Sequence, residues 1–311
     1  MEKRKLIILT GPTAVGKSKL SIKLAKTIGG EIISADSMQV YKYMNIGTDK
    51  ISPEKQENVP HHLIDFLDPK EDFNVFVFQK LVKEAIEGIY KRGHVPIIVG
   101  GTGFYIQAVI YDIDFTETDE DDVYRKELEE RARTEGVHVL HQELKEVDPE
   151  SAGAIHENNV KRVIRALEYY KKTGKPISEH NKEQKERSSP YDFKYFVLTD
   201  KRETLYSRID KRVDQMIEDG LEDEVKELLK LGIPKTATSM QGLGYREMFG
   251  YLEGEYDLSR AIYLIKRNTR HFAKRQLTWF KRERDVIWID KNDFDHNDDL
   301  ILKEIVRIYE Q

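Results

Sequence analysis

The sequence predicts an α/β fold in which a phosphate-loop (P-loop) core, a parallel sheet flanked by helices, carries an all-helical insertion domain. Three observations support this prediction. A buried-strand run precedes a phosphate-loop pattern, later strand runs alternate with helical patterns, and residues 119–185 contain helical patterns without a convincing strand. The predicted domains are therefore a core formed by residues 1–111 and 191–311, and an insertion formed by residues 112–190.

The core elements are expected in the following order. KLIILT at 5–10 is a short buried strand, and apolar residues at helical spacing predict a helix over 17–28. A second strand over 31–36 is followed by a helix over about 73–92, with Gly93 as its expected C-cap. The remaining elements are a strand and glycine turn over 95–105, a strand over 192–200, helices over about 201–219, 221–231 and 258–282, a strand over 285–289 and a final helix.

Composition excludes several classes of protein. The 311 residues are 39% hydrophobic and 34% charged, and no apolar run approaches the roughly 20 residues that span a bilayer. No signal peptide is recognised, so we expect a cytoplasmic protein without membrane association. The absence of cysteine rules out disulfides, thiolate-ligated zinc and a cysteine nucleophile. The net charge of −5 gives no general sign of nucleic-acid binding.

The strongest motif follows the first strand and fits the spacing G-x-x-x-x-G-K-[ST] without a mismatch. In such a loop, backbone N–H groups and the helix N-terminus bind phosphate oxygens, Lys17 adds a positive charge, and Ser18 suits Mg²⁺, the one cofactor expected. Whether a nucleotide such as ATP also binds is left open. The expected diphosphate-binding residues are Gly11, Pro12, Thr13, Ala14, Val15, Gly16, Lys17 and Ser18.

The partners of a nucleotide hydrolase are missing. Such enzymes use a strand that ends in an Mg²⁺-binding Asp, but the best candidate strand ends in Gly100-Gly101-Thr102. Asp36 follows the second strand instead, where it is either a turn residue or a catalytic group. The glycines at 100, 101 and 103 either start a helix or allow a ligand to approach. His61 and His62 are adjacent, which makes them poor joint metal ligands, and they are interpreted as structural.

Positive charge is concentrated near the C-terminal end. Nine arginines and lysines lie between Arg260 and Arg284, against the single acid Glu283. One face of the expected helix carries Arg267, Arg270, Lys274 and Lys281, and the packing face carries Ile262, Ile265, Thr269, Phe272 and Gln276. This favours binding of a phosphate backbone, although a solvated basic face is the alternative. A second basic segment in the insertion could hold the same nucleic acid from another side.

Taken together, these segments resemble the tRNA dimethylallyltransferase family, also called tRNA isopentenyltransferases, over nearly the whole chain. The resemblance rests on GPTAVGKS (11–18), DSMQVY (36–41), NIGTDK (45–50), PHHLID (60–65), VGGTGFYIQA (99–108), RVIRALE (162–168), DGLEDEV (219–225), QGLGYRE (241–247) and TRHFAKRQLTWF (269–280). Ile51 stands where the family usually has proline. The missing cysteines match the bacterial form, which lacks a zinc finger.

The resemblance implies transfer of a dimethylallyl group from its diphosphate to N6 of the adenosine on the 3′ side of the anticodon, in tRNAs that read codons beginning with U. Asp36 would be the base, Thr102 would lie near the substrate base, and Arg212 would contact the diphosphate. The partners implied are dimethylallyl diphosphate and the anticodon stem-loop of a tRNA. The enzyme itself is expected to be a monomer. The implied tRNA contacts are Asp36, Ser37, Met38, Gln39, Thr102, Arg125, Val160, Lys161, Arg162, Val163, Ile164, Arg165, Gln241, Arg270, Lys274 and Arg275. A small-molecule kinase and a non-catalytic RNA-binding protein are the alternatives.

Overall fold

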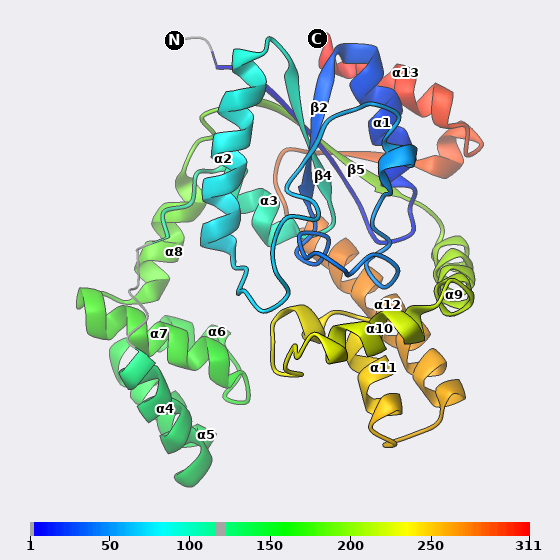
Figure 1. Cartoon of the computed structure of the whole chain (residues 1–311). Helices are drawn as coiled ribbons and strands as arrows, with labels where there is room; N and C mark the ends of the chain where they lie inside the picture. The colour runs from blue at the N-terminus through cyan, green and yellow to red at the C-terminus, as the bar shows by residue number, and fades with distance from the viewer. Residues whose placement is uncertain (1–2, 116–121) are drawn as a thin grey trace. The chain divides into compact units, whose positions relative to one another are not determined.

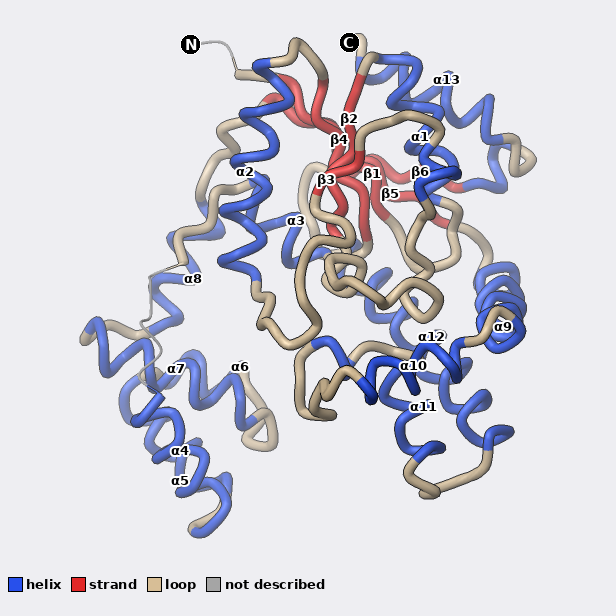
Figure 2. The backbone as a smooth tube through the Cα atoms, viewed as in Figure 1, coloured by secondary structure: helices blue, strands red, loops and turns tan. Residues whose placement is uncertain are grey.

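A computed structural model describes residues 3–115 and 122–311, drawn in Figures 1 and 2. The chain divides into two compact units, one comprising Met1–Ile110 with Pro190–Gln311 and the other Tyr111–Ser189. The expected insertion of residues 112–190 includes residues 116–121, which lie outside the described ranges.

The first unit is built on one sheet of six parallel strands, which confirms the predicted parallel sheet and adds one strand to it (Figure 2). Its order is β3-β2-β4-β1-β5-β6, so β4 lies between β2 and β1 although it follows both in the chain. β3 is a two-residue strand that the sequence pattern misses, because two histidines carry no periodicity. The strands are β1 (Lys5–Thr10), β2 (Gly30–Ala35), β3 (His61–His62), β4 (Val95–Gly100), β5 (Asp192–Thr199) and β6 (Val286–Asp290).

Helices cover both faces of this sheet (Figure 1). α1 (Lys17–Ile28) and α13 (Asp298–Tyr309) lie together on one face, and α2 (Val75–Lys91) and α3 (Gly103–Ile110) lie on the other. α2 ends one residue earlier than expected: Arg92 is its C-cap, and Gly93 follows with a left-handed φ of +76°. A buried core that includes Leu9, Leu24 and Phe196 fills the space beneath α1.

The remaining helices of the first unit are α9 (Arg202–Glu218), α10 (Leu221–Lys230), α11 (Tyr245–Leu252) and α12 (Leu258–Phe280). α12 packs against α9, α11 and α3, and α11 is a further element that the sequence pattern does not reveal. Short 3₁₀ helices occupy Pro53–Gln56, Ser239–Gln241 and Lys291–Phe294. Among the described residues, no helix is both long enough and apolar enough to cross a membrane.

The second unit is helical, and its described residues contain no strand. Its helices are α4 (Asp122–Thr134), α5 (Val137–Val147), α6 (Pro149–Ala154), α7 (Val160–Thr173) and α8 (Ile177–Glu186). Val163 and Ile164, two of the implied tRNA contacts, are 1% and 3% exposed and pack in the core of this unit, so their side chains are not available to an RNA. Arg125 makes two hydrogen bonds to the Glu168 carboxylate, at 2.9 and 3.0 Å, so its guanidinium ties α4 to α7.

Candidate active site at the carboxyl edge of the sheet

Three adjacent strands bring the predicted site residues together. Ala35 and Thr10, the last residues of β2 and β1, both pair with Gly100 at the end of β4. The three segments that follow these strands are the phosphate loop, the turn containing Asp36 and the turn over 101–103. They therefore emerge side by side at the carboxyl edge of the sheet, where ligands bind in open parallel sheets.

The two glycines of the phosphate-loop motif have the positive φ values that the motif predicts. Gly11 and Gly16 have φ values of +145° and +97°, and a Cβ atom on Gly11 would lie 2.4 Å from the carbonyl oxygen of Leu198. Within the described part of the chain, no side chain caps the N-terminus of α1. The N–H groups of its first turn are therefore open to an anion, and the helix dipole favours negative charge there.

Lys17 is held against this loop. Its Nζ donates hydrogen bonds to the carbonyl oxygens of Gly11 and Pro12, at 3.0 and 2.9 Å. Burial lowers the pKa of Lys17 to about 8; Arg212 lowers the pKa as well, and Asp36 and Asp49 raise it. The binding of a diphosphate would favour the charged amine and raise this pKa.

Arg212 extends from α9 to the same place. Its Nη1 lies 3.2 Å from Oγ1 of Thr13 and 3.1 Å from a carboxylate oxygen of Asp49. These residues line a cavity of about 370 Å³, which we call the phosphate cavity. It also contains Lys17 and Ser18. Arg212, the residue predicted to contact the diphosphate, thus reaches the phosphate loop.

A second cavity of about 300 Å³, here called the apolar cavity, adjoins the first. Its walls include Val213, Met216, Ile265 and Phe272, and Thr102 and Gln241 are among its polar residues. The residues common to both cavities are Thr13, Asp36, Thr48, Gly101, Arg212, Phe272 and Gln276. The arrangement is thus one site with a cationic half and an apolar half, and Asp36 lies where the two meet.

Asp36 is a turn residue whose carboxylate also lines both cavities. Its Oδ1 accepts hydrogen bonds from the backbone N–H groups of Met38 and Gln39, at 2.9 and 3.3 Å, which fixes the turn after β2. Among the described residues, none donates a hydrogen bond to Oδ2. Since Asp36 also lines both cavities, one oxygen is available to accept a proton from a bound substrate.

The glycines after β4 are explained by protein packing. A Cβ atom on Gly100 would lie 2.2 Å from the carbonyl oxygen of Ala35, and one on Gly103 would lie 2.2 Å from the ring of Trp279. A Cβ atom on Gly101 would lie 2.1 Å from Nε2 of Gln276. Contacts within the protein therefore account for these glycines without a ligand that approaches the backbone.

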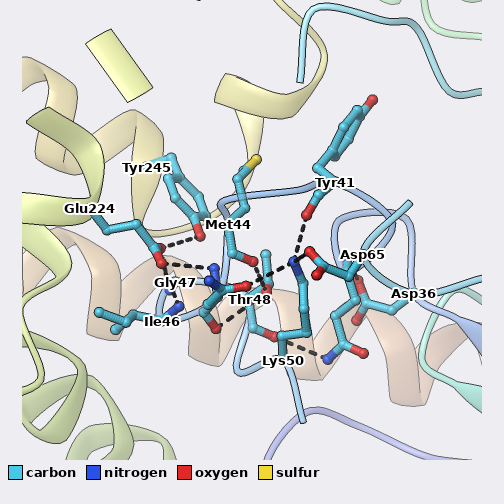
Figure 3. Close-up of polar contacts among 12 residues, drawn as sticks. Asp36, Tyr41, Met44, Ile46, Gly47, Thr48, Lys50, Asp65, Glu224 and Tyr245 are labelled. Carbon is cyan, nitrogen blue, oxygen red and sulfur yellow. Dashed lines mark hydrogen bonds and ion pairs between the residues drawn. The ribbon is translucent and has the colours of Figure 1, made fainter. Parts of the chain in front are cut away.

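Several motifs on which the resemblance rests hold one loop in place (Figure 3). The carboxylate of Glu224 accepts hydrogen bonds from the N–H groups of Asn45, Ile46 and Gly47, at 2.7–3.1 Å, and from the Tyr245 hydroxyl at 2.7 Å. This contact anchors the loop that places Thr48 and Asp49 in the phosphate cavity. The sequence does not identify Glu224, because its backbone partners lie about 180 residues away.

Gln39 and His62 form hydrogen bonds to other groups of the protein. Gln39, an implied tRNA contact, donates its side-chain amide to the carbonyl oxygens of Thr48 and Asp49, at 3.1 and 3.3 Å. His62 contacts the buried carboxylate of Glu31 at 2.6 Å, which agrees with a structural role for PHHLID. In the described ranges, no group of three or more His, Cys, Asp or Glu residues is placed to hold a metal ion.

The basic helix α12 is only partly available for an external anion. Arg270, an implied tRNA contact, donates to both carboxylate oxygens of Asp210 at 2.6 and 2.8 Å, so its charge is already paired. Lys274 and Arg275 are exposed instead. They line a hollow of about 440 Å³ together with His271, Thr278, Trp279 and Arg282. An RNA phosphate would therefore meet Lys274 and Arg275 more readily than Arg270.

Comparison with known proteins decides the family. A family model described as IPP transferase matches residues 39–283, and one described as isopentenyl transferase matches residues 4–65. The chain belongs to the IPP transferase family. A tRNA dimethylallyltransferase of Lachnoclostridium phytofermentans is 62% identical over 303 residues, covering 97% of this chain and 96% of that protein. One of Carboxydothermus hydrogenoformans is 56% identical over 286 residues, covering 92% of both.

Solved structures of IPP transferases have the same fold. A tRNA isopentenylpyrophosphate transferase from Bacillus halodurans has a TM-score of 0.74 and 47% identity, covering 99% of this chain and 97% of that one. A eukaryotic dimethylallyltransferase described as acting on tRNA has a TM-score of 0.81 and 34% identity, covering 92% of this chain and 74% of that one. Membership of this enzyme family favours a transferase over the kinase and the non-catalytic RNA-binding protein.

Proposed function

We propose that this IPP transferase moves the dimethylallyl group of dimethylallyl diphosphate to the exocyclic N6 of the adenosine on the 3′ side of the anticodon of a tRNA, in tRNAs that read codons beginning with U. The observation that carries the proposal is the divided site. A cationic cavity fits the diphosphate, an apolar cavity fits the branched allylic chain, and a carboxylate stands between them. The tRNA substrate leads us to expect a cytoplasmic enzyme, and residues of a single chain line both cavities, which suits a monomer.

The step follows from the chemistry of the substrates. The allylic C–O bond breaks, and its electron pair goes to the diphosphate, whose growing charge is stabilised by the phosphate-loop N–H groups, Lys17 and Arg212. The N6 nitrogen forms the new bond to the allylic carbon. Its lone pair is delocalised into the adenine ring, so removal of its proton by Asp36 assists the attack. No water has to be activated, which agrees with the glycine end of β4.

The site also suits Mg²⁺. This ion prefers oxygen ligands and is often bound by one or two carboxylates together with substrate phosphates and water. Ser18 lines the phosphate cavity with Asp49, so the chain supplies a hydroxyl and a carboxylate of this kind, apart from the carboxylate of Asp36. When bound, the ion would neutralise part of the diphosphate charge.

The test is an assay with labelled dimethylallyl diphosphate and an unmodified tRNA, run beside ATP with and without tRNA. Prenylated tRNA without ATP consumption is the result that we expect. Turnover of ATP alone would favour a kinase, and tRNA binding without either reaction would favour an RNA-binding protein.

The exposed cations of α12 lead to a further prediction. Replacing both Lys274 and Arg275 by Ala should weaken tRNA binding roughly tenfold near physiological salt. The dependence of log K on log salt should become shallower by about one unit for each phosphate that the variant no longer neutralises. The pair Lys26→Ala and Lys303→Ala, on α1 and α13, is the matched control. An unchanged salt slope in the α12 variant would assign these residues to an ordinary solvated face.

A further inference from the structure

Gln276 joins the two halves of the site from the buried side of α12. Its Oε1 accepts a hydrogen bond from the backbone N–H of Thr13 in the phosphate loop, at 2.9 Å. Its Nε2 donates to the carbonyl oxygen of Gly101, in the turn after β4, also at 2.9 Å. The side chain is only 6% exposed, and it lines both cavities.

The two hydrogen bonds leave little freedom to either turn. Thr13 and Gly101 belong to loops that follow different strands, and a buried amide that pairs with both must keep them at a set separation. Thr13 also receives the hydrogen bond of Arg212, and Gly101 immediately precedes Thr102. Gln276 is thus connected to a diphosphate contact on one side and to the acceptor side of the site on the other.

From this geometry we propose that Gln276 is a positioning residue for prenyl transfer. It holds the phosphate loop, where the diphosphate would bind, in register with the turn at 101–103, where Thr102 would lie near the acceptor base, so that the allylic carbon faces the N6 nitrogen. This inference rests on the proposed function. Transfer between two bound partners is sensitive to their separation, and a displacement of about 1 Å can reduce the rate on the order of 100-fold.

The variants Gln276→Met and Gln276→Glu test this role. The Met side chain is similar in length but pairs with neither turn, so kcat should fall on the order of 100-fold while the KM for dimethylallyl diphosphate changes by less than about threefold. An ionised Glu cannot donate to Gly101, but a protonated one can. The ratio of kcat in Gln276→Glu to kcat in the wild type should therefore rise as the pH is lowered from about 8 to about 6.

Gln79 provides the matched control. It is also 6% exposed, and its Nε2 donates to the carbonyl oxygen of Ala108 at 2.8 Å, outside both cavities. Gln79→Met should lower the melting temperature about as much as Gln276→Met and leave kcat unchanged. If the wild type is active and both variants lose kcat equally, or if the pH-dependent ratio is flat, Gln276 is only structural. If the wild type transfers no prenyl group, the proposed function fails, and this inference fails with it.

Discussion

Asp36→Asn should lower kcat for prenyl transfer by about 10²- to 10⁴-fold, the range associated with loss of a general base. In this structure the substitution removes the proton acceptor without disturbing the turn. An Asn side chain keeps an oxygen that can accept the N–H groups of Met38 and Gln39, so the turn after β2 is preserved while the proton acceptor is lost. Single-turnover transfer to tRNA measures the effect on chemistry, and binding of tRNA should change little.

Asp36→Ala serves as the comparison, because it removes both the base and the acceptor that fixes the turn. We expect it to abolish transfer and also to lower the melting temperature, whereas Asp36→Asn should melt near the wild type. Full activity in the Asn variant would contradict the assignment of Asp36 as the base.

Lys17→Met should lower kcat/KM for dimethylallyl diphosphate by about 10²- to 10³-fold, the scale observed for loss of one group that stabilises developing negative charge. The wild type adds a pH signature. The pKa of Lys17 is lowered to about 8, so its amine is charged below pH 8 and becomes neutral above it. The wild-type kcat/KM should therefore fall as the pH rises above about 8. This decrease should be absent from the pH profile of Lys17→Met.

Lys26→Met is the control for Lys17, since Lys26 lies on the same helix α1 and its charge pairs with Glu57 on the surface. It should retain wild-type kcat/KM at every pH. A decrease above about pH 8 that persists in Lys17→Met would have to come from another group and would overturn this explanation of the profile.

Much of the fold could be predicted because its signals are local. β1 contains the apolar run LIIL, β4 is apolar throughout, and β2 contains the pair Ile32-Ile33. The glycines of the phosphate loop mark a turn that few other residues adopt. β3 and α11 could not be predicted in this way. His61 and His62 form a strand because their backbone pairs with β2, and their side-chain pattern gives no sign of it.

The candidate site also contains residues that could be predicted from the sequence and others that could not. Lys17 and Asp36 can be selected from motif and position, and both line the phosphate cavity. The sequence pattern places Gln276 on a packing face and does not single out Glu224, because the role of each depends on backbone groups far away in the chain. Val163 and Ile164 show the opposite case, in which a basic segment includes residues that the helical unit buries in its core.

The sequence by itself determined the kinds of element, the phosphate loop and the family, since these depend on residues close together or in a recognisable order. The tertiary structure decided which groups remain available for a ligand. Arg270 is paired with Asp210, Gln39 with the backbone of the loop over 44–50, and Gln276 with two turns at once. The physical reason is that a charge or an amide becomes available or committed only when folding brings its partners within hydrogen-bonding distance.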